Sequence, residues 1–360
     1  MPKPLSARDD PSHGGLLNVA SLESWLDVNA PGLGSGPLQA TLLQGGISNA
    51  VFRISRGEGA AVLRRPPKVP RPDSERVIQR EATMLRALNG SDVPRPDLIA
   101  YCDDAGVVGE KFYLMACIDG WRRTGTADDP PPYNDKTSRA HRDLAFALLS
   151  GTEKLHLMDY KAVGLEGFAK PENFLERQVD RWLSQLESYK ASDGYAGRRI
   201  EGLDYLSDYL RANLPVTEHV GVIHGDYSFA NSLYHYGEPP RLAAMIDWEL
   251  TTIGDTLLDL GSVLYGFRSR RDRSPAVGFY GPEDFPVRED LAAHYAEATG
   301  RSVDRLDYYV VLAIFKLAAI MEGHVARALA GKSDPSAARS HADFVDRISA
   351  KALEIAKAEP

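Results

Sequence analysis

The sequence is poor in cysteine, in clustered positive charge and in long apolar runs. Its two cysteines, Cys102 and Cys117, form no CxxC pair, which argues against a disulfide framework or a cysteine zinc site and fits a reducing cytoplasm. The net charge of −8 argues against nucleic acid as the main partner, because phosphate backbones need clustered Lys and Arg. No run of about 18 apolar residues appears, so we expect no membrane partner and no membrane span.

The first 17 residues are predicted to be a disordered tail. They begin "MPKPLSARDDPSHGG", which is rich in Pro, Gly and charge and has no apolar core, so no signal peptide is expected. The whole chain has 360 residues, of which 43% are hydrophobic and 26% charged. This composition is that of an ordinary globular protein, and the length suits two domains.

Residues 18–118 predict a small β-rich lobe. A Ser-capped helix is expected over 21–32, and "ATLLQGGISNAVFRIS" predicts two strands joined by a glycine-rich bend. "AAVLRRPP", "DLIAYCDD" and "KFYLMACI" read as further strands. "DSERVIQREATMLRAL" predicts an amphipathic helix with Val77, Met84, Leu85 and Leu88 on one face.

Residues 119–360 predict a larger, mostly helical lobe. After a proline-rich loop, helical patterns cover about 138–159, 173–190, 201–213, 289–299, 304–331 and 335–357, and a β-rich island lies at 220–246. The expected fold is therefore α+β, with a nucleotide-binding first lobe, a catalytic and substrate-binding second lobe and a cleft between them.

The stretch "VIHGDYSFANSLY" at 222–234 carries the main chemical signal. Alone, its H-G-D-x-x-x-x-N pattern is more often a surface turn than a site. About fifteen residues later, "AAMIDWELTTIGDTLLDLG" delivers Asp247 at a strand end. An Asp, an Asn five residues on and a second Asp reproduce the kinase order. Asp226 is then the catalytic base, and Asn231 and Asp247 are oxygen ligands suited to Mg²⁺.

The first lobe offers a phosphate-binding pair. Arg64 stands where V-A-I-K places its lysine, and Glu81 on the following helix is its expected partner. An arginine can contact phosphate through its forked guanidinium, although Arg65 next to it leaves the choice open. The alternatives are a strand-end surface charge for Arg64 and a solvated helix face for Glu81.

Two further segments are expected to contact the nucleotide. The turn "GGISNAVFRI" holds Gly46, Ser48 and Asn49, whose backbone N–H groups could lie over phosphates. "FYLMACIDG" ends the first lobe, so the backbone of Ala116 and Cys117 would hydrogen-bond adenine at a hinge. Plain core packing is the alternative reading of Cys117.

Together these residues resemble the aminoglycoside phosphotransferase family of kinase-like enzymes. "GGISNAVFRI", "AVLRRPP", "HLMDYKAVGLEGFAKPENFLERQVDRWLSQ" and the C-terminal helices are similar to the phosphotransferase domain fused to acyl-CoA dehydrogenases. The resemblance covers roughly residues 20 to 355. It implies a bilobal, protein-kinase-like fold that uses ATP, or in some members GTP, with Mg²⁺.

The resemblance also assigns roles by position. Asp226 carries over as the catalytic base, and Asn231 and Asp247 carry over as metal ligands. Asp259 is expected to hydrogen-bond the catalytic-loop backbone. We favour a helix-capping role for Asp255.

Two departures from protein kinases point to a small hydroxylated acceptor. Gly225 replaces the arginine of H-R-D, which reads a phosphorylated activation loop. Only about eight residues separate Glu249 from a helix starting near Leu257, which leaves no room for a segment that docks a peptide.

Several readings stay open at this point. A catalytically inactive nucleotide-binding module and a metal hydrolase using His224 and Asp226 are the competing functions. Glu249 could bind a second metal, bind a cationic substrate or face solvent, whereas His224 is expected to be structural. Trp182 is expected to be packed in the core, and His156 is expected to be a packed or surface histidine rather than a ligand. The acceptor, whether an aminoglycoside, a hydroxyacyl compound or another metabolite, and the oligomeric state are undetermined.

Overall fold

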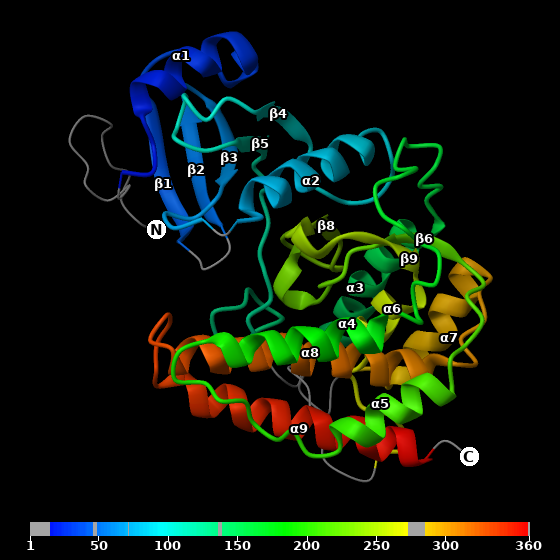
Figure 1. The fold of residues 1–360 in the computed structure, drawn as a ribbon. Helices are drawn as coiled ribbons and strands as arrows, with labels where there is room; N and C mark the ends of the chain where they lie inside the picture. Colours follow the sequence, from blue (N-terminus) through cyan, green and yellow to red (C-terminus); the bar gives the residue numbers. More distant parts are fainter. Residues whose placement is uncertain (1–14, 46–48, 71, 136–138, 273–284, 359–360) are drawn as a thin grey trace. The chain divides into compact units, whose positions relative to one another are not determined.

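The computed structural model describes residues 15–45, 49–70, 72–135, 139–272 and 285–358 (Figure 1). Backbone contacts divide the chain into two compact units. The first unit comprises Met1–Gly120, Val163–Leu165 and Ala243–Thr251, and the second comprises Trp121–Ala162, Glu166–Leu242 and Thr252–Pro360. The predicted tail over 1–17 lies mostly outside the described residues.

The first unit is built on a five-stranded antiparallel sheet. Its strands are β1 (Leu38–Gly45), β2 (Ala50–Arg56), β3 (Gly59–Arg65), β4 (Leu98–Cys102) and β5 (Phe112–Ala116), in the spatial order β1-β2-β3-β5-β4. The strand predictions for this part of the chain are confirmed.

The two faces of the sheet have different partners. Alternate residues such as Phe52, Leu63 and Leu114 are fully buried in one core with α1 (Val19–Asn29). The intervening residues of β3 and β5 point to the opposite face, where Arg64 and Tyr113 are cross-strand partners. Because side chains alternate along a strand, a polar pair can occupy one face while the apolar core fills the other.

Helix α2 (Ser74–Ala87) packs on β4 and β5. Its buried positions include Ile78, Ala82, Met84 and Leu85, with Glu81 among them. Val77, which the sequence pattern placed on the buried face, is half-buried, and Ile78 takes its place in the core.

The segment 243–251 belongs to the first unit, whereas the predicted boundary placed it with the helical lobe. Met245 N donates to Pro94 O at 2.8 Å, and Arg80 Nη2 donates to Thr251 O at 3.1 Å. The 3-10 turn Trp248–Leu250 contacts α2. These bonds explain why a segment far along the chain joins the sheet unit.

The second unit is mostly helical and matches the predicted helical patterns. Its helices are α3 (Ala140–Leu157), α4 (Gln178–Ser188), α5 (Leu203–Ala212), α6 (Leu257–Leu264), α7 (Arg288–Thr299), α8 (Leu306–Leu329) and α9 (Ala337–Ala358). Figure 1 shows α8 and α9 running side by side, in extensive contact. Trp182 is buried on α4, as expected for a core residue.

Short strands interrupt the helices. The strand β6 (Val220–Ile223) pairs antiparallel with β9 (Thr252–Asp255), β7 covers Ser232–Tyr234, and β8 covers Leu242–Met245. The loop 224–231, which carries the H-G-D-x-x-x-x-N pattern, joins β6 to β7.

Helix α8 is a long, largely buried helix of the second unit. It is long and apolar enough, by length and composition alone, to cross a membrane, and 78% of its most apolar window is buried within the protein. A core helix has the same properties. Its packing on α6 depends on Gly261, because a Cβ atom there would lie 2.5 Å from Tyr309 O.

One predicted helix cap is wrong. The first helix begins at Val19, and its cap is Asn18, whose Oδ1 accepts a hydrogen bond from Ser21 N at 3.2 Å. Ser21 therefore lies inside the first turn. Asn and Ser are comparable caps, so the apolar spacing alone could not choose between them.

Candidate phosphotransfer site

The first unit holds Arg64 in a cluster of carboxylates. Arg64 Nη2 lies 2.9 Å from Glu81 Oε1, 2.6 Å from Asp247 Oδ1 and 3.4 Å from Glu249 Oε2. Tyr113 OH donates to Glu81 Oε2 at 3.0 Å. The strand-to-helix pair expected from the sequence is therefore formed, and Arg64 and Glu81 are both buried rather than solvated.

The cluster carries more negative than positive charge. Burial raises the pKa of Glu81 to about 7, against the opposing pull of Arg64, and the negative charges of Asp247 and Glu249 act in the same direction as burial. Burial by itself would lower the pKa of Arg64, but Glu81 and the other neighbours raise it, so the guanidinium stays charged. Three carboxylates against one guanidinium leave two negative charges when all are ionised.

This donor set fits a divalent cation. Single oxygens of Glu81, Asp247 and Glu249 lie within 4.8 Å of one another. Hard carboxylate oxygens are the ligands that Mg²⁺ takes in proteins, and two excess negative charges match its charge. Asp247 has a left-handed backbone at φ 68°, a conformation that Asp tolerates better than most residues and that is enriched at functional sites.

Asn49 also reaches this cluster. Its Nδ2 donates to Glu249 Oε2 at 3.2 Å, so its buried side chain, and not only its backbone, is part of the site. Glu249 is therefore engaged by Asn49 and Arg64. Gly46 and Ser48, the other predicted phosphate-loop residues, lie outside the described residues.

The structure separates the two neighbouring arginines. Arg65 points to the opposite face of β3, where it donates to the backbone carbonyls of Leu16 and Val108. It is committed to holding the first unit together, whereas Arg64 faces the carboxylates. Phosphate contact by Arg64 stays a prediction, but Arg65 no longer competes for it.

The predicted hinge residues differ from each other. Ala116 N donates to Asp97 O at 2.8 Å, so that amide is already used within the first unit. Cys117 lies just past β5 and is exposed, which contradicts the core-packing alternative. Cys117 is thus the better of the two candidates for a backbone contact with adenine.

The second unit holds the predicted catalytic loop, residues 224–231. Gly225 has φ 87°, a left-handed conformation that favours glycine and lets the chain bend sharply after β6. Asp226 follows and is exposed. Asn231 Nδ2 donates to Asp226 Oδ2 and to Asp226 O, both at 2.8 Å, so the two predicted site residues of this loop are in direct contact.

A buried carboxylate holds the loop from below. Asp259 on α6 accepts hydrogen bonds from His224 N and, at 2.9 Å, from Gly225 N. The predicted role of Asp259 is confirmed. Burial opposes the ionisation of Asp259, but the nearby imidazoles of His156 and His224 and the hydrogen bond from Gly225 N outweigh it and lower the pKa of Asp259.

The neighbouring polar residues are structural. His156 Nε2 lies 3.8 Å from Asp259 Oδ2, and burial lowers the pKa of His156. His224 is fully buried and its Nδ1 accepts from Asp226 N at 3.3 Å, as expected of a structural histidine. The N-cap of α6 is Thr256, not Asp255; Asp255 precedes it, and its Oδ1 accepts from Leu257 N at 3.1 Å.

Sequence reasoning missed two cations in the second unit. A cavity of about 390 Å³ is lined by Asp226, Asn231, Arg123 and Lys316, among others. The guanidinium carbon of Arg123 lies 5.0 Å from the ring centres of both Phe229 and Phe285. Lys316 is a lone charge within the apolar pattern of α8, and this isolated charge could have indicated a functional residue from the sequence.

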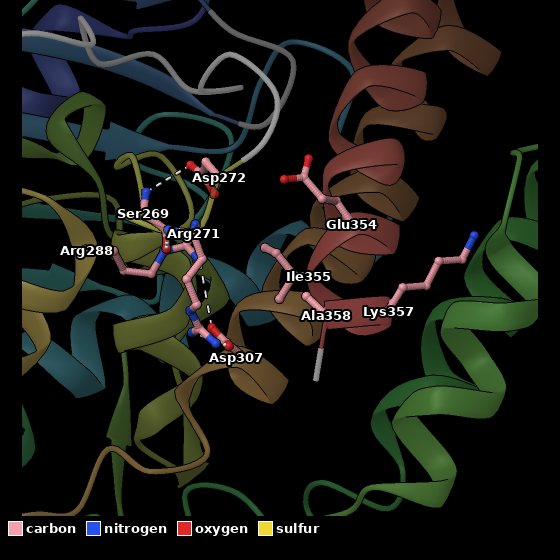
Figure 2. Close-up of a pocket in the computed structure, with 9 residues that line it drawn as sticks. All are labelled: Ser269, Arg271, Asp272, Arg288, Asp307, Glu354, Ile355, Lys357 and Ala358. Atoms are coloured by element: carbon pink, nitrogen blue, oxygen red, sulfur yellow. Dashed lines mark hydrogen bonds and ion pairs between the residues drawn. The ribbon is translucent and has the colours of Figure 1, made fainter. Parts of the chain in front are cut away.

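A second cavity, of about 280 Å³, lies where the end of α9 meets the loop after α6 (Figure 2). Its charged side chains pair with one another: Arg271 Nη2 contacts Asp307 Oδ2 at 2.6 Å, and Ser269 N donates to Asp272 Oδ2 at 2.8 Å. These pairs indicate a packing role for this cavity.

The predicted site residues therefore form two sets. Arg64, Glu81, Asn49 and Asp247 come together in the first unit, and Asp226 and Asn231 come together in the second. Joint metal binding by Asn231 and Asp247, which belong to different units, stays a prediction.

The model of the Phosphotransferase enzyme family matches residues 39–306. The chain belongs to this family. It is 29% identical over 352 residues to acyl-CoA dehydrogenase family member 11 of Gallus gallus, covering 95% of this chain and 44% of that protein. The chain thus spans less than half the length of the curated relatives it matches.

Two solved structures share the fold of the chain. A Ralstonia eutropha protein provisionally assigned as an aminoglycoside phosphotransferase is 26% identical, with a TM-score of 0.78 and coverage of 94% of this chain and 98% of that one. The choline kinase of Cryptosporidium parvum has a TM-score of 0.63 at 13% identity and covers 94% and 96% of the two chains. The α+β, kinase-like fold class and the family resemblance are confirmed.

Proposed function

We propose that this phosphotransferase moves the γ-phosphate of ATP to a hydroxyl group of a small molecule, with Mg²⁺ as the cofactor. The observation that carries the proposal is the buried pair of Arg64 and Glu81 with Asp247 2.6 Å from the same guanidinium. A cation on the third strand, a helix glutamate and a metal-binding aspartate are the parts that kinases use to hold nucleotide phosphates.

The residues have separate roles in the proposed reaction. Arg64 orients the α- and β-phosphates, and Glu81 holds Arg64 in place. Asp247 and Glu249, with Asn231, would hold Mg²⁺, which neutralises charge on the phosphates when bound. Asp226 orients the acceptor hydroxyl and receives its proton, and Asn231 and the backbone bonds of Asp259 keep Asp226 in position.

The charges that line the cavity of about 390 Å³ beside Asp226 limit which class of acceptor it could bind. Among the described residues that line it, Asp226 is the carboxylate, while Arg123 and Lys316 are cations. A polycationic aminoglycoside would need several carboxylates there. We propose a neutral or anionic hydroxylated acceptor, and a hydroxyacyl compound fits both this balance and the acyl-CoA dehydrogenase names of the longer relatives.

A substrate screen tests this proposal. ATP consumption would be measured with hydroxyacyl compounds, sugars and aminoglycosides, and thermal shifts would be recorded with the same compounds. We expect turnover with a hydroxylated acid or its thioester and none with aminoglycosides. Turnover with aminoglycosides alone would refute the proposed substrate class while leaving phosphoryl transfer intact.

The competing proposal is an inactive nucleotide-binding module. One observation favours it: Arg64 Nη2 forms an ion pair at 2.6 Å with Asp247 Oδ1, an oxygen that a metal would need as a ligand. Nucleotide binding without ATP consumption for any hydroxylated compound would support this alternative. The intact set of Asp226, Asn231 and Asp247 favours the enzyme.

A further inference from the structure

The catalytic loop contains no positive side chain of its own. Residues 224–231 read HGDYSFAN, without Lys or Arg. Phosphoryl transfer spreads negative charge over the oxygens of the moving group, and fixed cations near that group supply much of the rate enhancement. A cation from elsewhere in the chain should therefore reach this loop.

Lys316 reaches the loop from α8. Its Nζ donates a hydrogen bond to Gly225 O, the carbonyl of the peptide group that leads into Asp226. The side chain is 8% exposed and lines the same cavity as Asp226. Gly225 is thus held on both sides, since its N–H donates to Asp259 and its C=O accepts from Lys316.

Burying a lysine in an apolar helix costs free energy unless its ammonium group is paired with an opposite charge or hydrogen-bonded. Burial lowers the pKa of Lys316, and the negative charges of Asp226 and Asp259 oppose that shift. An ammonium group has three N–H donors. The hydrogen bond to Gly225 O uses one of them, and an anionic group entering the cavity beside Asp226 would offer acceptors to the others.

We propose that Lys316 is a catalytic residue whose ammonium group donates to an oxygen of the phosphoryl group during transfer. The proposal rests on the proposed function. In the step, the acceptor oxygen bonds to the γ-phosphorus, and its proton passes to the Asp226 carboxylate. The bond from the γ-phosphorus to the bridging oxygen breaks, and its electron pair leaves on ADP. Lys316 stabilises the charge and keeps its protons.

The geometry around Asp226 supports this assignment. The acceptor hydroxyl must lie within hydrogen-bond reach of Asp226, and the phosphorus must approach that same oxygen. The phosphoryl group therefore passes next to the peptide group that Lys316 binds. The guanidinium of Arg123 lies over the rings of Phe229 and Phe285, and from that place in the cavity lining it can contact the acceptor.

The test uses MgADP with aluminium fluoride, a planar anionic mimic of the moving phosphoryl group that needs no identified acceptor. Calorimetry would compare the unaltered 360-residue chain with Lys316→Met and Lys316→Arg, each with ADP alone and with ADP plus aluminium fluoride. We expect Lys316→Met to bind ADP normally but to lose about 100-fold of the extra affinity that fluoride gives. Lys316→Arg should recover part of that loss.

A matched control is Lys351→Met. Lys351 is a similarly buried lysine, at 4% exposed, paired with Asp272 beside the second cavity. This variant should have a lower melting temperature, but aluminium fluoride should increase its affinity for ADP as much as in the unaltered chain.

The outcomes are distinguishable. A full fluoride increment in Lys316→Met would overturn the role of Lys316. The role would also be overturned if Lys316→Met lost the same affinity for ADP alone as for the fluoride complex and had a lower melting temperature. That pattern indicates that Lys316 only stabilises the fold. A wild-type protein that binds no ADP, or gains nothing from fluoride, would instead refute the proposed function.

Discussion

Replacing Asp259 with Asn tests how the catalytic loop is held. The carboxylate accepts N–H bonds from His224 and Gly225 and is 1% exposed. An asparagine keeps one carbonyl acceptor, but it turns an NH₂ group toward the second N–H. Since the site is buried, that N–H has no alternative partner in water.

The magnitude follows from these two bonds. Leaving one buried N–H unsatisfied costs about 1–3 kcal/mol, and weakening the other from a charge-assisted to a neutral bond costs about 1 kcal/mol. The sum of about 2–4 kcal/mol corresponds to a fall of roughly 5–12 °C in the melting temperature of a unit of this size. The rate constant kcat should fall further than the loss of stability explains. The peptide groups of His224 and Gly225 directly precede Asp226, so the Asp226 side chain is displaced when they lose their hydrogen bonds to residue 259.

The assay combines thermal unfolding with kcat measured well below the melting temperature. The matched variant is Asp255→Asn, which removes an equally buried carboxylate that accepts hydrogen bonds from Leu257 N at the start of α6 and from Tyr309 OH at 2.8 Å. It should lose stability and keep kcat. If Asp259→Asn kept kcat while losing the same stability as Asp255→Asn, the loop-holding role would be wrong.

Three further predictions concern phosphate binding, pH and the metal. Arg64→Ala should weaken ATP binding by about 10–100-fold through loss of a charged phosphate contact, whereas Arg65→Ala should lower the melting temperature and leave the dissociation constant for ATP unchanged; equal effects in calorimetry would contradict the separation of the two arginines. Burial lowers the pKa of His156, so the unfolded chain takes up a proton below pH of about 6.5 that the folded protein does not, and stability falls as the pH drops. His156→Gln should flatten the fall in melting temperature between pH of about 6.5 and 5, and an unchanged slope would refute the assignment. Removing Mg²⁺ with a chelator should abolish the thermal stabilisation by ATP in the wild type, and Asp247→Asn should show little stabilisation with or without the metal.

Much of the site could be predicted from short motifs, because neighbours in sequence are placed by one element. The spacing in β3 and α2 predicted the pair of Arg64 and Glu81, and the loop spacing predicted the contact of Asp226 with Asn231. Strand alternation then decided between Arg64 and Arg65, once the partner of each face was visible.

What could not be predicted depends on contacts distant along the chain. Lys316 reaches Gly225 across 91 residues, through the close packing of α6 on α8 that Gly261 allows. The grouping of 243–251 with the sheet unit depends on hydrogen bonds to the Pro94 carbonyl and from the Arg80 side chain that no local pattern shows. Periodicity predicts elements, but it does not predict which elements meet.

The most direct test of phosphoryl transfer compares the wild type with Asp226→Asn. The change keeps the size of the side chain and removes the group that receives the acceptor proton. Nucleotide binding would be followed by calorimetry, and ADP and phosphorylated product would be followed by mass spectrometry with the best acceptor from the screen. The account predicts ADP and product from the wild type and, from Asp226→Asn, unchanged ATP binding with almost no product. Product formation by Asp226→Asn at the wild-type rate would contradict it.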